Sequence, residues 1–108
     1  MAKEASTQGI VQYIGLTELE RVEQEMVLKL VEEYSYKVRR ALHNITNLCV
    51  HIKQHSKGGK RERLEIMLRA IAPTRIFEVK TEDWDLARAI HKAFKDLVGE
   101  IEHNFKSR

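Results

Sequence analysis

Residues 48–68 contain the pattern that most restricts the fold, two alternating runs separated by a basic, glycine-containing segment. The apolar positions are Leu48, Val50 and Ile52 in the first run, and Leu64, Ile66 and Leu68 in the second. Such alternation places apolar side chains on one face of a strand and polar ones on the other. Between the runs lies the segment SKGGKR, whose glycines permit the backbone conformations of a turn. The sequence therefore predicts a β-hairpin with one apolar face and a cationic tip.

Two further segments outside the hairpin are predicted to be strands. Gln8–Ile14 is a short run that is rich in apolar residues and contains one glycine, with a second glycine directly after it. Arg75–Lys80 follows a break at Pro73, because proline cannot donate to a β-ladder. Phe77 and Val79 mark the apolar face of this second segment. Together with the hairpin, these segments give four strands.

The first of two helical segments is expected from Glu18 to about Leu42. Thr17 and Glu20 have the spacing of a capping box, which satisfies free amides at a helix start. Apolar residues then recur every three or four positions, as expected for a helix with one buried face. The members of this stripe are Leu19, Val22, Met26, Leu30, Tyr34, Val38 and Leu42. Acidic residues near the start and basic residues near the end match the helix dipole.

A second helix is expected to open within Thr81–Asp83, where each of the three residues could be its cap. Its apolar stripe consists of Leu86, Ile90, Phe94, Leu97, Ile101 and Phe105. Trp84 could stack on a nucleobase, but we interpret it as a large residue that anchors this helix on the sheet. Gly99 lies inside the segment and costs about 1 kcal/mol relative to alanine.

This order of elements predicts one α+β domain over residues 1–108. We expect a β-α-β-β-β-α two-layer sandwich, a four-stranded and mostly antiparallel sheet with two helices on one face. That arrangement buries all the apolar stripes at once, and the first helix would connect a parallel pair of strands. A single cysteine and the absence of a membrane-length apolar run favour a cytoplasmic protein with no membrane partner.

Positive charge is concentrated in the middle of the chain. The net charge is +3, but residues 37–74 hold nine basic and two acidic residues, a local net charge of +7. Rows of lysine and arginine suit contact with RNA phosphates, and two helices packed side by side could flank one groove. The candidate RNA-binding residues are Lys29, Lys37 and Arg40, Arg88, Lys92 and Lys95, and, at the hairpin tip, Lys57, Lys60 and Arg61. A solvated, merely basic surface is the alternative interpretation.

Neither catalysis nor metal binding is indicated by the pattern of reactive residues. The sequence has no nucleophile elbow, phosphate-binding loop or dinucleotide fingerprint. Cys49 and His51 share a strand face, but His51 and His55 lie roughly 13 Å apart along an extended strand, too far to share an ion. We therefore expect no enzyme activity, no metal and no cofactor.

The sequence resembles the ribosome hibernation promoting factors and the RaiA (protein Y, sigma-54 modulation) group, both in the order of its elements and in three segments. The segments are Gly15–Glu18 before a long helix, Cys49–Ile52 after it, and Glu82–Ile90 at the second helix. The resemblance implies a short form of the family, monomeric off the ribosome, that binds the small ribosomal subunit through ribosomal RNA. It also implies a steric mechanism, in which the domain occupies the channel for messenger and transfer RNA.

Two alternatives remain open at this stage. A double-stranded-RNA-binding domain has an α-β-β-β-α order that is contained in this one. That class opens its last helix with lysines, whereas the corresponding segment here, Thr81–Asp85, is acidic. A small α+β enzyme or a protein-interaction module is the alternative of another class, because fold does not determine function.

Overall fold

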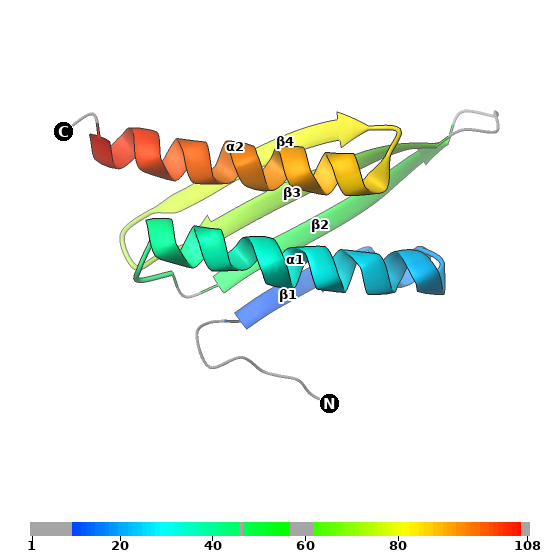
Figure 1. Cartoon of the computed structure of the whole chain (residues 1–108), viewed down its shortest axis with the longest axis horizontal. Helices are drawn as coiled ribbons and strands as arrows, with labels where there is room; N and C mark the ends of the chain where they lie inside the picture. The colour runs from blue at the N-terminus through cyan, green and yellow to red at the C-terminus, as the bar shows by residue number, and fades with distance from the viewer. Residues whose placement is uncertain (1–9, 46, 57–61, 107–108) are drawn as a thin grey trace.

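The computed structural model describes residues 10–45, 47–56 and 62–106, and confirms the predicted α+β fold. Four strands form one sheet in the order β1-β2-β3-β4, and both helices cover the same face of it (Figure 1). The hairpin tip, with Lys57, Lys60 and Arg61, lies outside the described residues. The elements are β1 (Ile10–Ile14), a 3-10 turn (Leu16–Glu18), α1 (Arg21–Ala41), β2 (Asn47–Ser56), β3 (Glu62–Ile71), β4 (Ile76–Asp83) and α2 (Leu86–Lys106).

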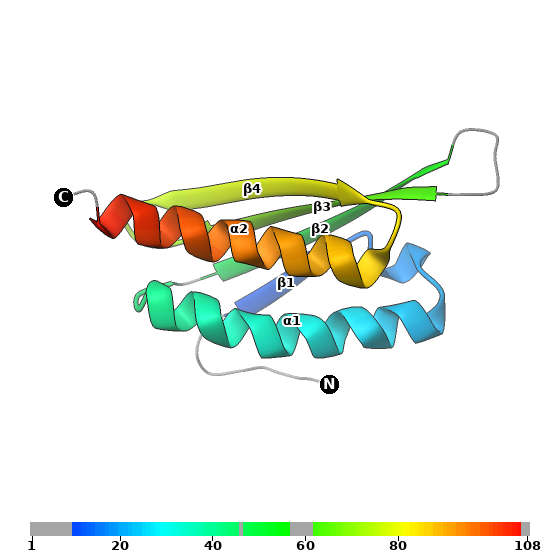
Figure 2. The same ribbon diagram turned by 45° about the horizontal axis from the view of Figure 1, so that its top comes forward.

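The sheet has one parallel pair and two antiparallel pairs, as expected from the sequence. β1 pairs with β2 in parallel, so α1 forms the crossover between them. β2 and β3 form the predicted hairpin, in which Val50 lies opposite Leu68 and Ile52 opposite Ile66. β4 continues the antiparallel arrangement at the far edge. The two helices lie side by side and run in the same direction, as Figure 2 shows.

The core lies between the sheet and the two helices. Val50, Ile66 and Leu68 on the sheet and Ile90 and Leu97 on α2 have no measurable exposure. Burying a side chain of this size contributes roughly 1.5–3 kcal/mol, so the interleaved rows supply most of the stability of the fold. The predicted stripe of α2 is confirmed from Leu86 to Ile101, and the side chain of Phe105 lies outside the described residues.

The predicted start of the first helix is wrong by one turn. α1 begins at Arg21, and the backbone N–H of Glu20 donates to Oε1 of Glu23 at 3.2 Å. Thr17 lies instead in the preceding 3-10 turn. That turn follows Gly15, whose φ of +88° suits glycine. Any other residue at this position would carry a Cβ that collides with the carbonyl oxygen of Ile52. The close approach to β2 makes the chain turn before the helix can begin.

The predicted apolar stripe of the first helix is also partly wrong. Val22 is 76% exposed in the first turn, whereas Val27 and Val31, which were outside the stripe, are buried. Met26, Leu30 and Tyr34 are half-buried and pack at the edge of the core. Because α1 packs against both the sheet and α2, its apolar arc is wider than a single stripe.

The junction between β4 and α2 differs from the prediction as well. Thr81, Glu82 and Asp83 belong to β4, and α2 begins only at Leu86. The cap is Asp85, whose Oδ1 accepts a hydrogen bond from the backbone N–H of Arg88 at 2.9 Å. Trp84 is 52% exposed, so it is not a buried anchor of the helix. Among the described helices, neither is long and apolar enough to cross a membrane.

Candidate nucleic-acid interface

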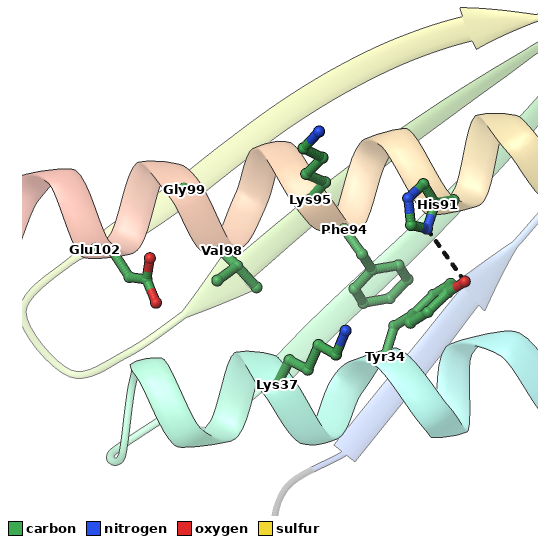
Figure 3. Close-up of a pocket in the computed structure, with 8 residues that line it drawn as sticks. All are labelled: Tyr34, Lys37, His91, Phe94, Lys95, Val98, Gly99 and Glu102. Carbon is green, nitrogen blue, oxygen red and sulfur yellow. Dashed lines mark hydrogen bonds between the residues drawn. The ribbon is translucent and has the colours of Figure 1, made fainter.

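A groove of about 510 Å³ runs between α1 and α2 on the outer side of the helical layer (Figure 3). Parallel packing of the two helices brings together residues that are more than fifty positions apart in the sequence. Residues from both helices line it: Tyr34, Lys37, His91, Phe94, Lys95, Val98, Gly99 and Glu102. The groove therefore exists only in the folded chain.

The floor of the groove is aromatic and apolar. The ring of Tyr34 lies 5.6 Å from the rings of both His91 and Phe94, measured between centroids. The Tyr34 hydroxyl and Nδ1 of His91 form a hydrogen bond of 3.2 Å across the two helices. Phe94 is buried and Val98 is half-buried. These contacts fix a surface on which an apolar or aromatic group can rest.

Lysines stand on both sides of this floor. Lys37 projects from α1, and its Nζ lies 5.8 Å from the centroid of the Tyr34 ring. Lys95 stands on the outer side of α2, where its side chain extends away from α1 (Figure 3). Neither lysine forms an ion pair with an acidic residue in the described part of the chain, and Glu102 lies at one end of the groove. The two ammonium groups are therefore available to an anionic ligand.

The other four predicted cations on the two helices do not line this groove. Lys29 and Arg40 are exposed on α1, and the guanidinium of Arg40 lies 5.6 Å from the ring centroid of Tyr36. Arg88 and Lys92 stand at the first turns of α2. The structure thus brings together Lys37 and Lys95 of the two helical rows and leaves the other four candidates outside the groove.

Arg88 and Lys92 are held by one acidic residue, Asp83. The Asp83 carboxylate accepts hydrogen bonds from Nε and Nη2 of Arg88 at 2.9 and 2.8 Å. The Nζ of Lys92 lies 3.0 Å from the same carboxylate and also donates to the carbonyl oxygen of Glu82. Hydrogen bonds from Arg88, from the Asp85 amide and from Lys92 hold the pKa of Asp83 far below its usual range. The carboxylate is therefore charged throughout the physiological range.

The opposite face of the sheet, which we call the open face, carries several ion pairs within the sheet. It is formed by the outward residues of the hairpin and β4, and three of its described cations pair with acids on neighbouring strands. Arg69 pairs with Glu78 at 3.1 Å, Arg63 with Glu82 at 3.4 Å, and Lys80 with Glu65 at 3.8 Å. Nε2 of His55 lies 2.9 Å from Oε1 of Glu65, and this hydrogen bond is the main cause of the lowered pKa of Glu65. The described residues contain no cluster of metal ligands on this face or elsewhere.

Two features of the site were missed from the sequence. Tyr34, a member of the predicted stripe, packs at the edge of the core, and its hydrogen bond to the exposed His91 across the groove was not anticipated. Asp83 was interpreted as a possible helix cap, whereas it binds two of the predicted RNA contacts. The only sequence signal for the latter was an aspartate with basic residues five and nine positions later.

The comparisons with known proteins concern the fold. A ribosomal subunit interface protein from Coxiella burnetii has a TM-score of 0.71 at 12% identity, over 92% of this chain and 99% of the other. The protein Y N-terminal domain from Thermus thermophilus has a TM-score of 0.58 at 23% identity, over 87% and 93%. The resemblance inferred from the sequence is thus confirmed as a shared fold. No protein-family model and no curated protein matches the sequence.

Proposed function

We propose that this protein is a ribosome-associated inhibitor of translation that binds RNA of the small ribosomal subunit. The observation that carries the proposal is the groove between α1 and α2, which has an aromatic floor and, on both sides, lysines that form no ion pair with a described acidic residue. Cations neutralise phosphates, and exposed aromatic surfaces receive nucleobases, so the pair of features suits RNA. The fold shared with a ribosomal subunit interface protein and with protein Y makes the ribosome the natural source of that RNA.

The proposed mechanism is steric and needs no chemical step. The domain would occupy the channel for messenger and transfer RNA, and phosphate contacts would hold it there without reading base sequence. A rigid two-layer domain suits this role, because it blocks the channel by its volume. We further propose that it acts in the cytoplasm and is a monomer when it is not bound to the ribosome.

Cosedimentation with purified small subunits at low and at high salt tests this function. We expect the protein to pellet with the subunits at low salt and to be released progressively as salt rises, because counterions compete for the phosphates. An in vitro translation reaction should slow in proportion to the protein that is bound. Absence from the subunit pellet at both salt concentrations would overturn the proposal.

Binding to a bare RNA duplex is the competing function. It is tested by comparing the affinity of the purified protein for a duplex with its affinity for small subunits. In that class the start of the last helix contacts phosphates. Here Asp83 is neutralised by its ion pairs, but Glu82 and Asp85 are exposed next to it. We therefore expect tighter binding to assembled subunits than to a duplex, and the reverse order of affinities would favour the duplex-binding class.

A further inference from the structure

We propose that the β4–α2 junction is a second, separate phosphate-binding subsite, in which Asp83 is a positioning residue for Arg88 and Lys92. The inference rests on the proposed RNA-binding function and extends it beyond the groove. It assigns a role to an acidic residue that would by charge alone be expected to weaken RNA binding.

The exposed fractions of the three side chains show that the two cations lie nearer to solvent than the carboxylate does. The Asp83 side chain is only 9% exposed, while those of Arg88 and Lys92 are 62% and 44% exposed. The carboxylate thus lies beneath the two cations and they form the outer surface. A ligand that approaches from solvent meets the guanidinium and the ammonium group first.

The geometry of the contacts leaves donors free on both cations. Arginine has five N–H groups, of which Asp83 engages those of Nε and Nη2, so three point elsewhere. Lys92 uses two contacts, to Asp83 and to the carbonyl oxygen of Glu82. Its ammonium has three N–H groups, which leaves one free. The junction therefore offers a fixed fork and a fixed ammonium group, the arrangement that a phosphate accepts.

Preorganisation is the reason that an acid can strengthen binding to an anion. Arginine and lysine side chains lose rotamer freedom when they bind, and a side chain that is already held loses less. The opposing repulsion from Asp83 acts partly through solvent and is reduced by salt. Arg88, Lys92 and Asp83 together carry a net charge of +1, and Asp85, whose charge also acts on Arg88, brings the local sum to zero. The subsite therefore depends on the free N–H groups of the two held cations and not on an excess of positive charge.

The decisive variant is Asp83→Asn, which raises the net charge by one and yet should weaken binding. We expect the affinity for a short single-stranded RNA and for small subunits to fall roughly threefold to tenfold, the size usual for coupled neighbouring side chains. Glu82→Gln is the matched control, because it makes the same charge change at the adjacent residue, whose carboxylate pairs with Arg63 on the open face. We expect that control to bind as well as the wild type, or better.

A double-mutant cycle separates positioning from a general structural effect. In an Arg88→Gln background, Asp83→Asn should have a clearly smaller effect on affinity, because its main partner is already absent. Arg88→Lys, which keeps the charge but loses the fork, should also weaken binding and serves as the deciding variant if Asp83→Asn does not fold. Circular dichroism shows whether each variant is folded.

The outcomes distinguish this inference from the proposed function. If the wild type binds subunits but Asp83→Asn binds as tightly as Glu82→Gln, the subsite is overturned and the proposed function stands. If the wild type does not bind subunits, the proposed function fails and the single-stranded RNA measurement decides the subsite alone. Absence of binding to that RNA overturns the subsite as well.

Discussion

The basic residues on the two faces of the molecule have different partners. On the open face, Arg63, Arg69 and Lys80 each face a carboxylate on a neighbouring strand. On the helical face, Lys37 and Lys95 flank a groove and have no ion pair with a described acidic residue. Composition alone cannot distinguish cations that pair within the sheet from cations that line the groove, since basic and acidic residues occur on both faces. The difference indicates that the paired charges on the open face serve the sheet and that the two lysines of the groove are left for a partner.

The distribution of stability follows the same division. The apolar side chains that face the helices are buried on β2 and β3 and half-buried on β1, whereas the open face carries many long polar side chains. Exposed ion pairs of that kind contribute little, about 0–1 kcal/mol each. The core between the sheet and the helices should therefore determine whether the chain folds. The outer surface of the helices should determine what the chain binds.

The largest expected effect compares two neighbours on β3 that point to opposite faces. Ile66→Ala should reduce the free energy of unfolding by about 2–5 kcal/mol, because Ile66 is fully buried beneath the helices. Met67→Ala, on the half-buried open face, should cost about 1 kcal/mol or less. Urea unfolding followed by circular dichroism measures both. Equal losses would contradict a core confined to the helical face.

An intermediate effect concerns Glu65, the acid at the centre of the open face, whose side chain is 11% exposed. Its folded-state pKa is lowered, so its stabilising contribution is present above its unfolded pKa of about 4.3 and is lost as pH falls. Glu65→Gln should cost about 1 kcal/mol at pH 7, because the charged hydrogen bond to His55 is weakened. Unfolding curves at pH 7 and pH 3 should show a smaller acid-induced loss for the variant than for the wild type.

The matched control for that series is Glu78→Gln, which breaks an exposed ion pair on the same face. We expect its stability to follow that of the wild type closely at both pH values, since the pair with Arg69 is accessible to solvent. A change as large as that of Glu65→Gln would mean that the open face is stabilised by its ion pairs collectively and not by its one buried carboxylate.

The smallest expected effect is a gain in stability at the edge of the groove. Gly99 lies in the middle of α2, and a Cβ built there would meet nothing within 4 Å. Gly99→Ala should therefore raise the free energy of unfolding by about 0.5–1 kcal/mol through helix propensity alone. Thermal unfolding measures the gain, with Glu100→Ala as the neighbouring exposed control. A loss of stability would show that the helix at this position is packed more closely than the geometry indicates.

The element order and the hairpin could be predicted from sequence because period-2 and period-3.6 patterns are local. Ile52 and Ile66, which lie opposite each other, belong to the inward sets of the two alternating runs, and the register follows from that alternation. The phase of α1 could not be predicted, because Val22 and Val27 are equally apolar in sequence. Their burial depends on where the chain turns after Gly15, which a contact with β2 decides.

The site was only partly accessible to the same reasoning. The groove was anticipated as a consequence of side-by-side helices, and the structure brings Lys37 and Lys95 to it. The row of Arg88, Lys92 and Lys95 was predicted from helical spacing, which does not describe what lies beneath the helix start. Asp83 reaches two members of that row because β4 turns into α2 within a few residues, a geometry that no periodicity encodes.

The most direct test of the contrast between the two faces is the affinity for small subunits after removal of the same charge from each. Lys37→Gln with Lys95→Gln removes two cations from the groove, and Arg69→Gln with Lys80→Gln removes two from the open face. We expect the groove pair to lose about tenfold or more in affinity and to show a weaker salt dependence, while the open-face pair binds nearly as the wild type does. Equal losses in the two double variants would contradict the account, because binding would then follow total charge and not the groove.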